Sequence, residues 1–98
     1  MAEIGFHPEA QAEYDSAMEW YRIRNPRAAD RFEVAVDRTL DDIRRMPEMY
    51  PWYDEEHRFA VLRRFPYLLV YQVLDTNHVT VVAVAYSGRQ PGYWSGRV

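Results

Sequence analysis

The residue types in this sequence that could do chemistry are arginine and the aromatic side chains, and both gather toward the C-terminus. Guanidinium groups form paired hydrogen bonds with phosphate or carboxylate, and aromatic faces stack on bases or pack against a partner. The same residues could instead serve the fold, through ion pairs with acidic helices or by packing in the core. The candidate binding residues are Arg63, Arg64, Arg89, Tyr93 and Trp94.

The segment around Arg89 is the strongest part of this candidate surface. Glycines and a proline flank Arg89, and they can hold its guanidinium in a turn just beyond the last predicted strand. Tyr93 and Trp94 are adjacent, so in an extended segment one of them anchors in the core while the other faces outward. Arg63 and Arg64 would point to opposite faces of a regular strand, so that only one of them can join a given cleft.

Other kinds of chemistry have little support in the sequence. His7, His57 and His78 lack the spacing of metal ligands, and we expect exposed histidines. The chain has no cysteine, which excludes a thiol nucleophile. Its serines lack the G-x-S-x-G setting, and no glycine-rich loop is suited to phosphate binding. We therefore expect no metal site and no cofactor.

Length and composition describe one globular domain over residues 1–98. The content of 48% hydrophobic and 28% charged residues is typical of a folded protein. No apolar run approaches the roughly 20 residues that a membrane span needs. The N-terminal segment does not resemble a signal peptide, so we expect the protein in the cytoplasm and away from membranes.

Charge is divided unevenly along the chain. Residues 1–56 hold 14 acids and 7 arginines, whereas residues 57–98 hold one acid and 5 arginines, which together give the net charge of −3. This division indicates two faces with different partners. The acidic total predicts that the chain alone does not bind DNA.

The predicted elements begin with a short strand at residues 4–6, followed by two helices. Apolar residues recur at helical spacing over residues 8–24, with Glu13 among the charged residues on the outer face. A second helix starts at Pro26, after an asparagine suited to capping it, and stops before Pro47. The short link between them predicts an antiparallel helical hairpin.

Three strand-like runs follow, at residues 57–65, 67–75 and 78–86. The links between them are short, which favours an antiparallel meander. The order is therefore β-α-α-β-β-β. We predict an α+β domain in which the helical hairpin packs on one face of a small antiparallel sheet.

Four stretches of this sequence resemble the RelE/ParE toxin superfamily, over nearly all of residues 4–97. They are HPEAQAEYDSAMEWY (7–21), RMPEMYP (45–51), RRFPYLLVYQVLD (63–75) and VVAVAYSGRQPGYW (81–94). The resemblance implies a toxin of a type II toxin–antitoxin module, a group historically called plasmid stabilisation proteins. It also implies a cognate antitoxin that covers the sheet and represses the operon through its own DNA-binding domain.

The superfamily contains two activities, and the resemblance favours one of them. RelE-like members cut messenger RNA on the ribosome with basic residues and a tyrosine, whereas ParE-like members inhibit DNA gyrase. Phe59, Val61 and Leu68 stand where the RelE-type basic residues are expected, while Arg89 and Tyr93 match. We therefore expect a ParE-like toxin that acts by binding. The alternatives are a RelE-like endoribonuclease that uses Arg89 and Tyr93, and an inactive or repurposed family member that serves only as an interaction module.

Overall fold

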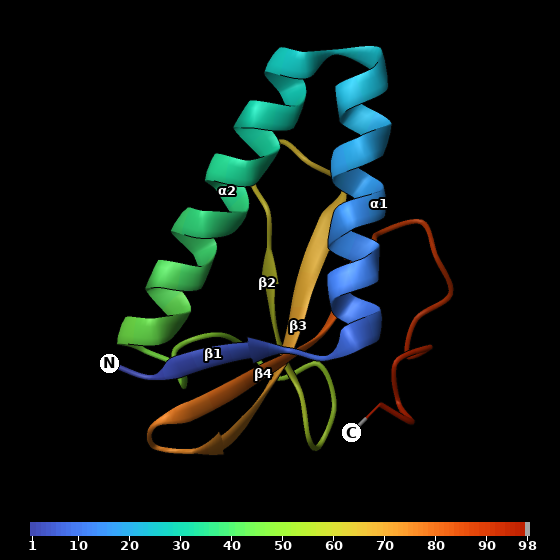
Figure 1. The fold of residues 1–98 in the computed structure, drawn as a ribbon. Helices are drawn as coiled ribbons and strands as arrows, with labels where there is room; N and C mark the ends of the chain where they lie inside the picture. The colour runs from blue at the N-terminus through green and yellow to red at the C-terminus, as the bar shows by residue number, and fades with distance from the viewer. Residues whose placement is uncertain (98) are drawn as a thin grey trace.

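Two helices lie on one face of a four-stranded sheet in the computed structural model, which describes residues 1–97 (Figure 1). The element order is the predicted β-α-α-β-β-β. Neither helix has the length and apolar character of a membrane-spanning segment. The elements are β1 (Glu3–Phe6), α1 (Pro8–Arg24), α2 (Pro26–Arg45), β2 (Arg58–Val61), β3 (Tyr67–Asp75) and β4 (His78–Tyr86).

A single residue, Asn25, ends α1 and begins α2. Its backbone N–H donates to the carbonyl oxygen of Tyr21 in the last turn of α1. Its side-chain oxygen accepts hydrogen bonds from the N–H groups of Arg27 and Ala28, at 3.1 and 3.4 Å, in the first turn of α2. These bonds satisfy backbone groups that a helix end leaves open, and they confirm the predicted hairpin.

The strand order in the sheet is β1-β4-β3-β2. The pairs β2–β3 and β3–β4 are antiparallel, as predicted, but β1 runs parallel to β4, with Ile4 opposite Val79. The prediction of a purely antiparallel sheet is therefore wrong at this edge. Short links force strands to reverse direction, whereas β1 connects to the other strands through both helices, which is long enough for a parallel crossover.

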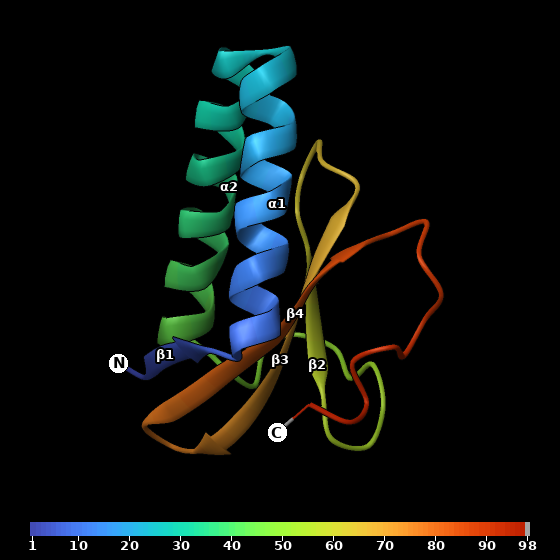
Figure 2. The ribbon, with the colours of Figure 1, turned by 45° about the vertical axis from the view of Figure 1, so that its right-hand side comes forward.

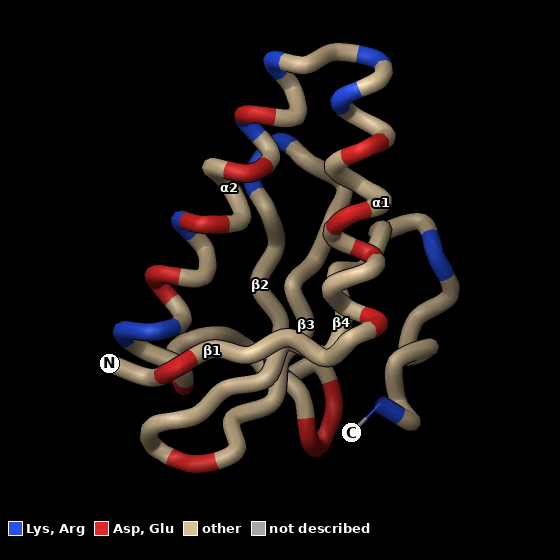
Figure 3. The backbone as a smooth tube through the Cα atoms, in the orientation of Figure 1, with Lys and Arg blue, Asp and Glu red and all other residues tan. Residues whose placement is uncertain are grey.

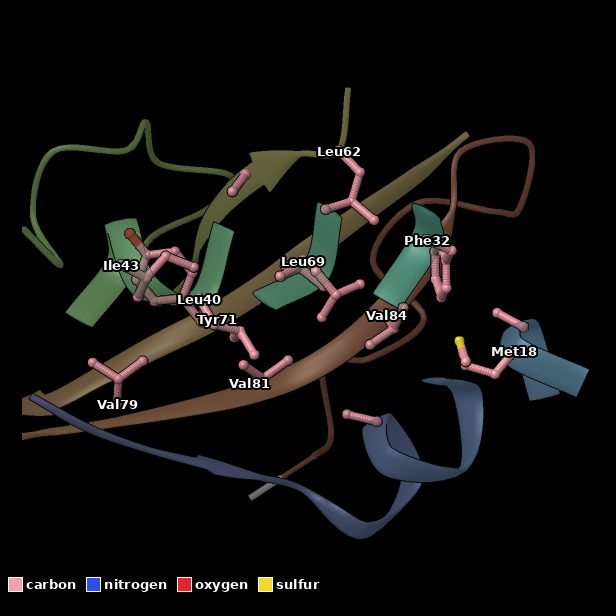
Figure 4. Close-up of a cluster of buried hydrophobic side chains, with 14 of the residues drawn as sticks. Met18, Phe32, Leu40, Ile43, Leu62, Leu69, Tyr71, Val79, Val81 and Val84 are labelled. Atoms are coloured by element: carbon pink, nitrogen blue, oxygen red, sulfur yellow. The ribbon is translucent and has the colours of Figure 1, made fainter. Parts of the chain in front are cut away.

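The sheet buries side chains on both faces. On the helix side, Phe32 and Ile43 of α2 pack against Leu69 and Val81 of the sheet (Figure 4). On the opposite side, residues 87–97, which we call the tail, fold back over the sheet (Figure 2). Trp94 is the largest side chain there and is only 1% exposed. The tail therefore covers the face of the sheet that the helices leave open, and a second hydrophobic core forms there.

A bulge in β4 interrupts the alternation of its side chains. Val70 pairs with Ala83 and Tyr71 pairs with Val81, which leaves Val82 as an extra residue without a partner on β3. Val82 and Ala83 both belong to the cluster beneath the tail. The extra residue changes the direction of the strand backbone at this point, next to the tail.

The segment before β2 is ordered around a buried histidine. His57 is 4% exposed, and its Nδ1 lies 2.9 Å from Oδ1 of Asp54. Burial raises the pKa of the Asp54 carboxyl, but hydrogen bonds from Glu56 and His57 outweigh it and lower that pKa below its usual value. The prediction of an exposed histidine is wrong at His57, because this segment folds onto the edge of the sheet and shields the ring.

Trp94 should contribute far more to stability than an exposed tryptophan. Trp94→Ala is expected to lower the free energy of unfolding by about 3–5 kcal/mol, because it opens a cavity beneath the tail. The matched control is Trp52→Ala, since Trp52 is 58% exposed and stacks only on Arg58; it should cost about 1 kcal/mol or less. Urea unfolding followed by circular dichroism measures both. Equal losses would contradict the role assigned to Trp94.

Candidate functional site

A groove of about 650 Å³ lies between α1 and the C-terminal end of β4. Two residues of the tail, Arg89 and Tyr93, close its third side. Its walls are mainly aromatic or small side chains, and two of the lining residues, Glu13 and Arg89, are charged. The lining residues are Ala12, Glu13, Ser16, Ala17, Trp20, Tyr21, Pro66, Tyr67, Val84, Tyr86, Arg89 and Tyr93.

The edge of β4 beside this groove has no neighbouring strand in the described part of the chain. β1 ends at Phe6, opposite Val81, so the rest of β4 is unpaired on that side. Side chains satisfy part of this edge instead. Glu13 accepts a hydrogen bond from the N–H of Val84 at 3.0 Å, and Arg97 donates to the carbonyl oxygen of Val82 at 2.9 Å. Such contacts offset the cost of leaving buried backbone groups without partners.

Glu13, which lines the groove, also binds Arg97 of the tail. Two guanidinium nitrogens donate to the two carboxylate oxygens at 3.0 and 3.1 Å, and the side chains are only 16% and 11% exposed. Burial lowers the pKa of Arg97, but the Glu13 carboxylate outweighs it and raises that pKa above the usual value. The prediction that Glu13 faces solvent is wrong. Arg97 of the tail, 84 residues further along the chain, covers this one acid of the outer helix face.

Arg89 and Tyr93 lie together at the rim of the groove, near the same carboxylate. The guanidinium carbon of Arg89 is 3.8 Å from the ring centroid of Tyr93, and one of its nitrogens is 3.5 Å from Glu13. Gly92 permits the intervening turn, because its φ of 77° is unfavourable for residues with a Cβ. The Arg89 side chain remains 55% exposed, so its guanidinium is accessible to a partner.

Tyr93 is poorly suited to accepting a proton from a substrate. Its hydroxyl is buried and has no hydrogen-bond partner among residues 1–97. Burial, together with the Glu13 carboxylate, raises the pKa of Tyr93 to about 12. At neutral pH this phenol stays protonated, which disfavours a role as general base. Within the same range of residues, no three His, Cys, Asp or Glu side chains gather to hold a metal ion.

The mouth of the groove exposes large aromatic surfaces that the sequence analysis did not single out. Trp20 and Tyr86 are 51% and 53% exposed on opposite walls. Tyr67 links the walls, with ring centroids 5.7 Å from Tyr86 and 6.5 Å from Tyr21. The available signal was Trp20 itself, a tryptophan outside the predicted buried stripe of its helix, since exposed aromatic patches mark binding sites.

The five residues predicted to form one surface lie in three places. Arg89 and Tyr93 line the groove, whereas Trp94 is buried beneath the tail as the core anchor. Arg63 and Arg64 do not line the groove. The prediction of a strand over residues 57–65 is wrong at these two arginines. β2 ends at Val61, and both arginines belong to the following turn.

Comparison with known proteins gives a family and a fold. A family model described as "ParE toxin of type II toxin-antitoxin system, parDE" matches residues 4–91. The chain is similar to a solved structure described as "Chromosomal ParDE TA system from P. aeruginosa". The TM-score is 0.74 at 14% sequence identity, over 88% of this chain and 96% of that chain. No curated protein matches the sequence.

The carboxylate of Glu13 should be essential for attaching the tail. Glu13→Gln is expected to lower the free energy of unfolding by about 1–3 kcal/mol, because it leaves the buried guanidinium of Arg97 without its charged partner. Glu9→Gln is the matched control. Glu9 also lies near Arg97, at 3.4 Å, but is 65% exposed, so the change should cost no more than about 1 kcal/mol. If urea unfolding gives equal values for the two variants, the assignment to Glu13 fails.

Proposed function

The chain belongs to the ParE toxin family of type II toxin–antitoxin systems, and we propose that it acts by binding and inhibiting a cellular target, DNA gyrase. A cognate antitoxin neutralises it by occupying the groove between α1 and β4. The observation that carries the proposal is the groove itself. It combines exposed aromatic walls with one accessible guanidinium, that of Arg89, which suits recognition of another protein.

The positions where RelE-type enzymes carry basic residues argue against RNA cleavage here. Phe59 packs edge-on against Tyr53, with ring centroids 5.7 Å apart, and Leu68 packs in the same cluster beneath the tail. Neither can present a charge to a phosphate. With the pKa of Tyr93 at about 12, the remaining pair of Arg89 and Tyr93 offers charge without an effective general base.

The proposed antitoxin segment has a definable chemistry. Apolar or aromatic anchors fit between Trp20 and Tyr86, whose exposed rings lose contact with water when the groove is filled. An Asp or Glu beside those anchors pairs with Arg89 at the rim. Family membership supports an antitoxin partner, and so does the similar structure, which is described as a ParDE TA system.

Production of the chain in a bacterium without its antitoxin tests the mode of action. DNA synthesis is expected to stop before protein synthesis, because the proposed target acts on DNA. Arg89→Ala should abolish this growth arrest while changing the free energy of unfolding by about 0–1 kcal/mol, since the ion pair of Arg89 is exposed. Arg38→Ala removes an exposed arginine of α2, distant from the groove lining, and should leave the arrest intact.

Two results of this experiment would contradict the proposal. Early arrest of translation with cut transcripts would identify a RelE-like enzyme. Normal growth, with the chain present and folded, would identify an inactive or repurposed family member.

Filling the groove should separate the toxin from its antitoxin. Ser16 is an exposed residue of α1 that lines the groove, so Ser16→Trp is expected to weaken binding of the protein encoded beside the toxin gene by tenfold or more. Gln11→Trp adds the same side chain to α1 outside the groove lining and should not weaken binding. Calorimetry on the purified proteins measures both affinities. Equal affinities for the two variants would mean that the antitoxin binds elsewhere.

A further inference from the structure

Positive charge gathers at the closed end of the helical hairpin (Figure 3). Residues 20–31 and 61–66 together contain six arginines and one acid, Asp30. The rest of the chain holds 14 acids and six arginines. The two segments therefore carry a net charge of +5, and the rest of the chain carries −8. We call this surface the arginine end; it comprises Arg22, Arg24, Arg27, Arg31, Arg63 and Arg64.

The turn between β2 and β3 joins this surface because it packs onto the hairpin. Phe65 in that turn lies between the two helices, with ring centroids 5.4 Å from Tyr21 and 5.3 Å from Phe32. Arg63 and Arg64, which precede Phe65, are therefore held beside the arginines of α1 and α2. The charge pattern along the sequence does not reveal that these arginines form one surface, since those of the helices and those of the turn lie in different halves of the chain.

Most of these arginines lack a carboxylate partner in the described part of the chain. Arg22 pairs with Glu19, but no ion pair forms at Arg27, Arg31, Arg63 or Arg64, all of which are exposed. Of the six arginines outside this end, four do form ion pairs: Arg44, Arg45, Arg89 and Arg97. A guanidinium without a partner keeps its hydrogen-bond donors available to phosphate.

Two further details suit this end to contact a partner. Arg64 has a φ of 70°, a left-handed backbone that is uncommon for residues other than glycine and is found at functional turns. On α1, the guanidinium carbon of Arg24 lies 4.0 Å from the ring centroid of Trp20, and one of its nitrogens donates to the carbonyl oxygen of that residue. These contacts hold Arg24 at the surface before any partner arrives.

We propose that the arginine end contacts the phosphate backbone of duplex DNA. Closely spaced phosphates can pair with several guanidinium groups at once, and such contacts need no apolar pocket. The net charge of −3 predicts a poor DNA binder, but this total conceals the separated charges. Binding by the chain alone is therefore weak and strongly dependent on salt. This surface borders the groove at Trp20, but none of its six arginines lines the groove, and the proposal does not depend on gyrase being the target.

Fluorescence anisotropy with a labelled 20-base-pair duplex tests the proposal on the purified chain. Four phosphate contacts predict a loss of affinity of about 100-fold between 50 and 200 mM salt. Arg63→Gln combined with Arg64→Gln should lower the affinity at 50 mM salt about tenfold and halve the salt dependence. The matched control is Arg44→Gln combined with Arg45→Gln, which removes the same charge at the far end of α2, roughly 25 Å from Arg27. The control should change the affinity by less than about threefold.

A second double variant keeps the test decisive if the variant with Arg63→Gln and Arg64→Gln fails to fold. Arg27→Gln combined with Arg31→Gln alters only exposed positions of α2 and should lower the affinity similarly. Ser16→Trp, which fills the groove, should leave DNA binding unchanged. The proposal is wrong if the wild-type chain does not bind DNA at 50 mM salt, or if the control lowers the affinity as much as either arginine-end pair. It is also wrong if polyglutamate binds as tightly as DNA, because an acidic polypeptide would then be the partner.

Discussion

The carboxylate of Glu13 is the contact on which the arrangement of the groove depends. It binds the N–H of Val84 on the unpaired edge of β4 and both terminal nitrogens of Arg97 in the tail, and it lies near Arg89. One side chain thereby joins a helix, a strand and the C-terminal segment. Without this junction, the exposed contact between Glu9 and Arg97 would be the remaining ion pair between the tail and α1 in the described part of the chain, and the rim of the groove, with Arg89 and Tyr93, would lose its support.

The parts of the fold that could be predicted from sequence are those with local causes. Pro26, after a capping asparagine, marks the start of α2, and Pro47 follows its end. The bounds of β3 and β4 follow from continuous runs of strand-forming residues separated by a tight turn. For the site, the association of Arg89 with Tyr93 was also predictable, because only three residues separate them and one of these is Gly92, which permits a turn.

The parts that could not be predicted depend on contacts between distant segments. Glu13 resembles the other acids on its helix until the tail covers it. The parallel pairing of β1 depends on the path of both helices, and the extra residue at Val82 is hidden in a run of similar apolar residues. Arg63 and Arg64 were assigned to the tail surface because they share its half of the sequence, whereas Phe65 holds their turn against the helices.

The proposed inhibition by binding requires an accessible surface rather than a reactive group, and the groove provides such a surface. A supercoiling assay with purified DNA gyrase tests this account most directly. The account predicts that the purified chain blocks supercoiling, that Arg89→Ala does not, and that adding the antitoxin restores the enzyme. Unimpaired supercoiling at saturating concentrations of the chain, together with cleavage of messenger RNA on ribosomes by the same preparation, would contradict it.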